Sequence, residues 1–203
     1  MKKHELESVK NFADLDLSMS YSYADYYSWE FDERVELING RVFTITQPGT
    51  KHQQISGAIS AKLYGHLKRK PIAVFAAPFD VRFPNFSHAD EDIFTVLQPD
   101  VCVFCDASKL DTRGGIGAPD IVVEILLPGD NRKELKNKFE VYEESRVSEY
   151  WIIHPEEKTF FRYTLDDNGK YQPSHLLTLG DEVTTPILPG FVLNLDGVFA
   201  PGP

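Results

Sequence analysis

Glu124 is an acidic residue inside an apolar run, residues 121–127, that is typical of a buried strand. A carboxylate in such a strand loses its hydration, and an ionised group that is desolvated without a partner is too costly to remain uncompensated. We therefore expect a positive group, either a metal ion or a lysine, close to Glu124. The alternative is that Glu124 lies on a solvated strand face, although apolar residues occupy both faces of this run.

Asp100 and Lys138 are the residues that could meet Glu124. Asp100 follows a proline at the head of another apolar run, and Lys138 lies on the helix predicted after Glu124. If the two strands are neighbours, the carboxylates meet at one edge of the sheet, where they repel each other unless a cation intervenes. Oxygen ligands with room for water suit Mg²⁺ or Mn²⁺. A lysine beside such an ion could orient or deprotonate an attacking water and neutralise charge on a phosphate.

Asp100 and Lys138 can each also be explained by a purely structural role. Asp100 could cap a turn, and Lys138 could be a solvated cation on a helix surface. Glu134, Lys138 and Tyr142 share a helix face because they are four residues apart, but spacing alone does not show whether that face meets the sheet. Asp120 also follows a proline, and we interpret it as the entry of the strand that it begins.

The composition indicates a globular protein with one core. The chain has 203 residues, of which 42% are hydrophobic and 26% charged, and this length suits one domain better than two. No apolar run reaches the roughly 18 residues of a membrane span. Cys102 and Cys105 are interpreted as reduced thiols of a cytoplasmic protein. The formal net charge of −10 argues against a protein that coats nucleic acid, but not against a nuclease whose metal supplies positive charge locally.

The order of the predicted elements indicates one α/β domain with a mixed central sheet. A lead-in, residues 1–20, is expected to precede a single domain, residues 21–203. The dipeptide Asn39-Gly40 is typical of the type I′ turn of a hairpin, here at residues 35–45. The other predicted elements are helices at 23–31, 52–67 and 131–145, strands at 72–83, 96–104, 120–127 and 149–154, and a hairpin at 160–179.

Three further segments carry predictions of their own. Residues 109–117 are expected to form a polar, glycine-rich connection, and residues 128–130 a turn. Tyr26, Tyr27 and Trp29 form an aromatic cluster near the N-terminus. For this cluster, packing in the core or in a dimer is favoured over stacking on nucleobases.

Several segments, spread over most of residues 22–195, together resemble a known family. They are residues 35–42, the helix opening at His52, residues 98–101, residues 118–126, Glu134 with Lys138 and Tyr142, and residues 149–153. In order and spacing they resemble the Uma2 family (DUF820), a branch of the PD-(D/E)XK nuclease superfamily. The resemblance implies a restriction endonuclease-like fold, in which helices flank a mixed central sheet that carries additional hairpins.

The resemblance also implies the catalytic residues. Asp100 corresponds to the aspartate of the nuclease motif, and Glu124 to its second acidic residue. The lysine that usually follows two residues later would fall at Leu126, which cannot serve. Lys138, on the next helix, fits the position to which the lysine of this family has moved.

Four other residues match positions near the implied site. Glu36 matches an acidic position that often joins Asp100 and Glu124 in holding the metal. His52 matches a family position close to the site, and Glu134 and Tyr142 are candidate accessory residues.

The activity implied is hydrolysis of DNA phosphodiester bonds by a homodimer that depends on Mg²⁺ or Mn²⁺. One alternative is a catalytically inactive relative that binds nucleic acid or a partner protein, which the net charge of −10 and Leu126 favour. Another is an enzyme that acts on a different phosphate-containing substrate.

Overall fold

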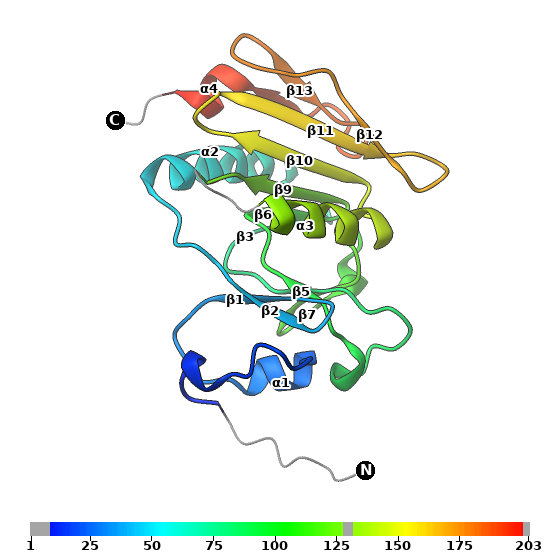
Figure 1. The fold of residues 1–203 in the computed structure, drawn as a ribbon. Coiled ribbons are helices and arrows are strands. Elements are labelled where there is room, and N and C mark those ends of the chain that lie inside the picture. Colours follow the sequence, from blue (N-terminus) through cyan, green and yellow to red (C-terminus); the bar gives the residue numbers. More distant parts are fainter. Residues whose placement is uncertain (1–8, 128–131, 201–203) are drawn as a thin grey trace.

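The computed structural model describes residues 9–127 and 132–200, without the side chains of residues 132–134. The predicted turn at residues 128–130 therefore lies outside the described residues. Two six-stranded sheets make up most of the fold, and they occupy the lower and upper parts of Figure 1. The α/β class predicted from the sequence is confirmed, but the strands form two sheets where one was expected.

The first sheet contains, in spatial order, β2 (Arg41–Thr44), β1 (Val35–Ile38), β5 (Val96–Leu97), β4 (Val81–Arg82), β8 (Gly114–Ile116) and β7 (Leu110–Asp111). The second sheet contains β12 (Tyr171–Pro173), β11 (Thr159–Leu165), β10 (Glu149–His154), β9 (Ile121–Ile125), β6 (Val101–Phe104) and β3 (Ala73–Ala76). Both sheets are mixed, because β4 pairs with β8 and β9 with β10 in parallel while their other strand pairs are antiparallel.

The remaining described elements are the helices α1 (Tyr23–Ser28), α2 (Thr50–Leu67), α3 (Arg132–Glu144) and α4 (Leu195–Phe199), the 3-10 turns η1 (Phe12–Asp14), η2 (Asp90–Asp92) and η3 (Ala107–Lys109), and the hairpin β13 (Glu182–Thr184) and β14 (Val192–Asn194). Among the described residues, none of these helices has the length and apolar character needed to cross a membrane.

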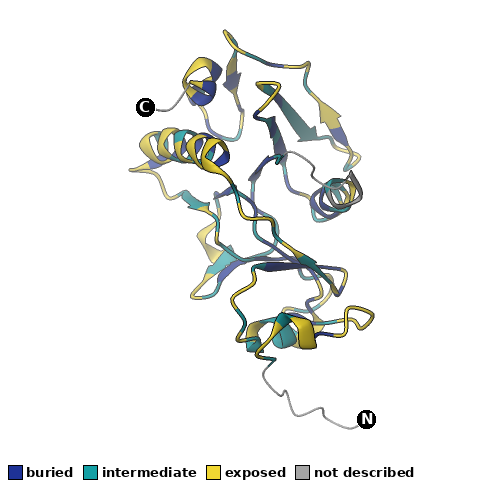
Figure 2. Cartoon of the chain, turned by 60° about the vertical axis from the view of Figure 1, so that its left-hand side comes forward, coloured by how far each residue is buried: buried dark blue, intermediate teal, exposed yellow. Residues whose placement is uncertain are grey.

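Helices α2 and α3 cover opposite faces of the second sheet. Ile59 of α2 packs in one cluster with Val123 of β9, whereas Tyr142 of α3 packs in another with Val122. Successive strand residues point to opposite faces, so β9 is covered on both. In this sheet β6, β9 and most of β10 are buried, whereas β3, β11 and β12 are mainly intermediate or exposed, and α2 exposes its outer face (Figure 2). Burial on both faces explains why residues 121–127 read as a nearly continuous apolar run.

Two segments that were predicted as single strands cross from one sheet to the other. Residues 96–104 divide into β5 of the first sheet and β6 of the second, with Pro99 between them. Residues 72–83 divide in the same way into β3 and β4, with Pro78 between them. Proline has no amide hydrogen to donate to a strand ladder, so each segment can change partners at that point. The predicted mixed central sheet flanked by helices is confirmed by the second sheet, whereas the prediction of a single strand at residues 72–83 and at 96–104 was wrong.

Residues 109–117 were expected to be a polar connection, but they add β7 and β8 to the first sheet. The alternation that marks a half-buried strand is hidden here by glycine. A Cβ atom on Gly115 would lie 2.5 Å from Cζ of Phe104, so glycine lets an aromatic side chain of β6 pack directly on the β8 backbone. Because two of the three residues of β8 are glycines, this strand has little hydrophobic signature.

The local signals near the N-terminus were read correctly. Asn39 and Gly40 have φ values of 51° and 77°, as a type I′ turn requires, and they join β1 to β2. Ser22 and Asp25 form the reciprocal hydrogen bonds of a capping box at the start of α1. This helix ends at Ser28, earlier than the predicted residue 31.

Candidate active site

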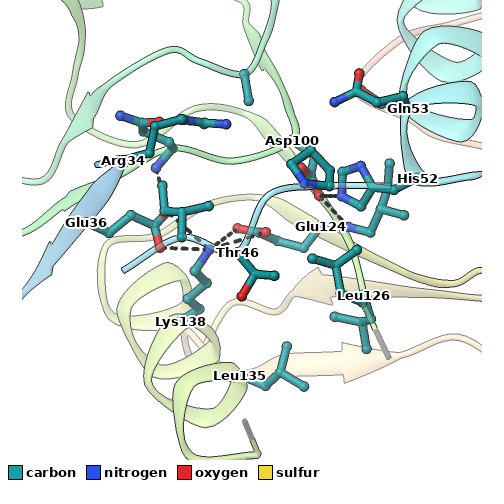
Figure 3. A pocket seen from close by; sticks show the side chains of 17 residues that line it. Arg34, Glu36, Thr46, His52, Gln53, Asp100, Glu124, Leu126, Leu135 and Lys138 are labelled. Carbon is teal, nitrogen blue, oxygen red and sulfur yellow. Dashed lines mark hydrogen bonds and ion pairs between the residues drawn. The ribbon is translucent and has the colours of Figure 1, made fainter. Parts of the chain in front are cut away.

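Asp100 and Glu124 lie next to each other at the edge where the two sheets meet. The strands β6 and β9 are antiparallel neighbours with Val101 opposite Val123, so Asp100, just before β6, comes level with Glu124. The two strands are thus neighbours, which is the condition under which the two carboxylates were expected to meet, although Asp100 itself lies just before its strand. Both line a pocket of about 100 Å³, which we call the acidic pocket (Figure 3).

Helix α3 brings Lys138 into the same pocket. Its Nζ lies 3.2 Å from Oε1 of Glu124 and 3.0 Å from Oε2 of Glu36. One helical turn later, the hydroxyl of Tyr142 donates a hydrogen bond of 2.6 Å to Oε1 of Glu124. The helix face that carries Lys138 and Tyr142 therefore meets the sheet edge, which spacing alone could not establish. Glu134 belongs to α3, but its side chain lies outside the described residues.

Glu36 comes from β1 and makes the first sheet part of the pocket wall. Its side chain is 1% exposed, and its Oε1 accepts a hydrogen bond of 2.7 Å from the backbone amide of Gln98. Its Oε2 has no hydrogen-bond partner of good angular geometry, so its 3.0 Å contact with Lys138 is mainly ionic. The acidic pocket is thus built between the two sheets, with α3 closing it from one side.

His52 is held against Asp100 from the first turn of α2. Its Nε2 lies 3.1 Å from Oδ2 of Asp100, and the same oxygen accepts a hydrogen bond of 2.7 Å from the backbone amide of Ile125. Burial lowers the pKa of His52, but the hydrogen bond and charge of Asp100, together with the charge of Glu124, outweigh it and leave that pKa raised. His52 therefore fixes one oxygen of Asp100, and its raised pKa favours the charged form of the imidazole.

The pKa values of Glu124 and Lys138 are both raised, by a combination of burial and nearby charge. Burial, opposed by Lys138 and reinforced by Asp100 and Glu36, raises the pKa of Glu124 to about 7. Burial lowers the pKa of Lys138, but attraction to Glu124 and Glu36 outweighs it and leaves that pKa raised. The two shifts are compatible because the lysine faces several carboxylates, whereas Glu124 faces one lysine and two other acids. Lys138 is therefore shared by two carboxylates, while Arg34 and the imidazole of His52 line other parts of the pocket.

The donor set suits a hard divalent ion only in part. All the acidic groups are oxygen donors, and Mg²⁺ needs no more than one or two carboxylates because it retains water and takes phosphate oxygens. Against this, Lys138 lies between Glu36 and Glu124, and no group of three or more His, Cys, Asp or Glu among the described residues is arranged to hold a metal. Of the acidic residues in the pocket, Asp100 and Glu124 are the two that such an ion could use as ligands.

Asp120 is placed apart from these residues. Its Oδ2 accepts a hydrogen bond of 2.7 Å from the backbone amide of Cys105, at the entry of β9, and it does not line the acidic pocket. This agrees with its interpretation as a residue that marks the start of the strand.

Two residues that line the acidic pocket, Arg34 and Gln98, were not singled out by the sequence analysis. Arg34 precedes Glu36 by two residues, so an extended backbone places both side chains on one face. Gln98 is separated from Asp100 only by Pro99. Those spacings were the available signals, and both were weak because polar residues beside a strand are common.

Residues 23–196 match the model of the Uma2 family, whose description is "Putative restriction endonuclease". "Uncharacterized protein slr1290" of Synechocystis is 24% identical over 163 residues, which cover 76% of this chain and 82% of that protein. The crystal structure of "a putative nuclease belonging to DUF820" from Anabaena variabilis superimposes with a TM-score of 0.70 at 19% identity, covering 88% of this chain and 97% of that one. At this identity, the structural likeness establishes the fold alone.

Proposed function

The chain belongs to the Uma2 family, and from that premise we propose that it is a metal-dependent endonuclease that hydrolyses DNA phosphodiester bonds. The observation that carries the proposal is that Asp100, Glu124 and Lys138 meet in one pocket although they come from three separate elements. Two carboxylates and an amine of this kind suit phosphate chemistry, since the substrate is an anion that needs compensating charge.

Asp100 and Glu124 would hold Mg²⁺ or Mn²⁺, with Glu36 as a further oxygen donor. When bound, the ion would polarise the phosphate and lower the pKa of a water ligand. His52 holds one oxygen of Asp100, and Tyr142 holds one oxygen of Glu124, so the remaining oxygens are presented in fixed directions.

Lys138 acts as a donor in this proposal. A lysine whose pKa is raised stays protonated, so it cannot remove a proton from water. Its ammonium can orient the water and stabilise charge that develops on the phosphate. Of the roles considered from the sequence, the structure therefore favours positioning and charge stabilisation over deprotonation.

Nicking of supercoiled plasmid in the presence of Mg²⁺ tests the proposal. Wild-type protein should nick the plasmid, and a chelator should stop it. Glu124→Gln and Lys138→Gln should each lower the rate by about 100-fold or more. Lys136→Gln is the matched control, because this lysine is on the same helix with a side chain that is 73% exposed. The proposal would be refuted if the folded wild type nicks DNA with neither Mg²⁺ nor Mn²⁺, or if Glu124→Gln keeps full activity.

The second candidate is an inactive relative that binds nucleic acid or a protein. The observation that favours it is the ammonium of Lys138 between Glu36 and Glu124, which can satisfy these acids without a metal. Calorimetric titration separates the two candidates. The nuclease should bind Mg²⁺ and lose that binding in Glu124→Gln, whereas the inactive relative should show no binding that depends on Glu124.

The proposed substrate, DNA, also motivates a proposed assembly. A homodimer would present two symmetric pockets, one for each strand of a duplex. Sedimentation equilibrium at micromolar concentration should give twice the mass of one chain, and a monomer would contradict this part of the proposal.

A further inference from the structure

Arg34 is the one cation lining the acidic pocket that is not matched to a carboxylate among the described residues. Lys138 and His52 form ion pairs with acidic side chains, whereas Arg34 donates from Nε and Nη2 to Oε1 of Gln98, at 3.1 and 2.6 Å. An amide carries no net charge, so it orients the guanidinium without neutralising it. An arginine held in this way keeps its affinity for an anion.

The orientation of Gln98 is fixed by its partners. Its Nε2 donates to Oδ1 of Asp80 at 2.9 Å and to the hydroxyl of Tyr26 at 3.0 Å. Arginine can only donate hydrogen bonds, and an aspartate carboxylate accepts them, so the amide oxygen of Gln98 must face Arg34. The Tyr26 hydroxyl in turn donates to Oδ1 of Asp80 at 3.0 Å. The amide nitrogen of Gln98 is therefore fixed by Asp80 and Tyr26, and its amide oxygen fixes Arg34.

Arg34 and Gln98 also line a second cavity, of about 310 Å³, which we call the aromatic pocket. Its aromatic lining residues are Tyr26, Tyr27, Trp29 and Phe31. Because the acidic and aromatic pockets share two lining residues, they adjoin each other at Arg34.

The aromatic side chains that line this pocket are only partly covered by other residues of the protein. Trp29 stacks on Phe31 with ring centroids 5.4 Å apart, but both remain half-buried, and Tyr27 is 60% exposed. Asp32 and Glu33 line the same cavity and are exposed. Their charge repels an anion, so Arg34 is the residue of this lining that can bind one. The combination of one cation with the exposed ring of Tyr27 and the half-buried ring of Trp29 suits a nucleotide.

We propose that Arg34 and the aromatic pocket form a subsite for one unpaired nucleotide of the strand whose phosphodiester lies in the acidic pocket. Arg34 binds its phosphate, and the rings of Tyr27 and Trp29 contact its base. A base inside a duplex is stacked and paired, so the subsite requires a strand that is single or splayed apart at this point. The subsite deepens the proposed nuclease function and rests on it for its position beside the cleaved bond.

Binding of a short oligonucleotide without metal tests the subsite separately from cleavage. The chain has two tryptophans, and Trp151 is 0% exposed, so a change in tryptophan fluorescence on titration reports mainly Trp29. In a chelator, a single-stranded DNA of mixed sequence should quench the fluorescence, and the same sequence as a blunt duplex should bind at least about tenfold more weakly. Arg34→Gln and Tyr27→Ala should each weaken binding of the single strand by about tenfold.

Matched controls come from residues of the same type elsewhere on the surface. Tyr64→Ala changes a tyrosine that is 62% exposed on α2, and Arg41→Gln changes an exposed arginine on β2, and neither residue lines the two pockets. Both variants should bind as the wild type does. All variants are compared by thermal unfolding. Where an alanine or glutamine variant does not fold, Tyr27→Leu removes the ring but keeps apolar bulk, and Arg34→Lys removes the planar fork but keeps the charge.

The outcomes distinguish the subsite from the proposed function. Equal binding of single strand and duplex, no binding by the wild type, or unchanged binding by both Arg34 and Tyr27 variants would overturn the subsite even if plasmid is nicked. Fluorescence that changes with protein concentration and not with DNA would instead assign the aromatic pocket to a second copy of the chain, and would also overturn it. Binding that depends on Arg34 in a protein without nicking activity would support the subsite and contradict the nuclease.

Discussion

Two buried glutamates, Glu124 on β9 and Glu149 on the adjacent strand β10, have opposite surroundings. Both are at most 7% exposed, and burial raises the pKa of each. Their strands pair in parallel, but the two side chains point to opposite faces of the sheet. Glu149 lies on the same face as Trp151, which belongs to one core cluster, and Glu124 lies on the same face as Val122, which belongs to the other. Burial alone therefore does not distinguish a functional carboxylate from a structural one.

The partners of the two residues make the difference. Glu149 accepts one hydrogen bond of 2.8 Å on each oxygen, from Nε1 of Trp151 and from the hydroxyl of Thr185. These are neutral donors, and each carboxylate oxygen has its own. Glu124 instead meets Lys138 and Tyr142 within a pocket that also contains other acids. A carboxylate matched to neutral donors is a cross-link within the core, whereas one that shares a cation with other acids is poised to bind an ion.

The largest expected effect separates activity from stability at Glu124. Glu124→Gln keeps the size of the side chain and removes its charge, so the proposed metal site loses a ligand while Lys138 keeps Glu36 as its ionic partner. We expect the rate of plasmid nicking to fall by about 1,000-fold and the free energy of unfolding to change by less than about 1 kcal/mol. Nicking assays and urea denaturation measure the two quantities. Loss of several kcal/mol of stability would assign Glu124 to the same structural class as Glu149.

The converse change at Glu149 should affect stability and leave the chemistry alone. Glu149→Leu leaves Nε1 of Trp151 and the hydroxyl of Thr185 without their acceptor inside the core. A buried donor without a partner costs about 1–3 kcal/mol, so we expect the free energy of unfolding to fall by about 3 kcal/mol. Residual folded protein should bind Mg²⁺ as the wild type does. A variant of unchanged stability would show that Glu149 is not a cross-link.

Features that depend on neighbouring residues could be predicted from the sequence. Glu124 was found because it interrupts an apolar run, and Lys138 because it lies on the helix that follows and matches a family position. The hairpin at Asn39-Gly40 follows from backbone chemistry that is confined to two residues. Each of these signals lies in a short stretch of the chain, so it can be recognised without a structure.

The features that were missed depend on contacts between distant segments. Arg34 meets Gln98 across 64 positions, and the backbone of Gln98 meets Glu36 across 62. The division of the fold into two sheets follows from strand crossings at Pro78 and Pro99, and a proline in an apolar segment does not show which sheet each half joins. No periodicity records which strand lies beside which, so the acidic side of the pocket was predictable while its arginine and amide were not.

A smaller effect should appear in the pH dependence of stability. Burial raises the pKa of Glu149, and the hydrogen bonds from Trp151 and Thr185 only partly oppose it. An acid whose pKa is higher in the folded state favours folding at low pH, and that contribution is lost as the pH rises through the folded pKa. Relative to Glu149→Gln, which does not titrate, the wild type should therefore lose stability as the pH rises from about 4.5. Urea denaturation across pH 4–8, roughly the range of perturbed carboxyl groups, measures the difference, and parallel curves would contradict it.

The smallest effects should come from the hydroxyls that hold the two carboxylates. Tyr142→Phe removes a single hydrogen bond to Glu124, and Thr185→Val removes the one to Glu149 together with the one that its hydroxyl accepts from the amide of Ile187, each with little change in shape. Thr185→Val should lower the free energy of unfolding by about 1–2 kcal/mol and leave nicking unchanged, because Thr185 does not line the acidic pocket. Tyr142→Phe should slow nicking by about tenfold, because an unheld Glu124 presents its oxygens less precisely to an ion. If Tyr142→Phe instead changed stability alone, the hydroxyl would be part of the core, and the distinction between the two glutamates would rest on Lys138 only.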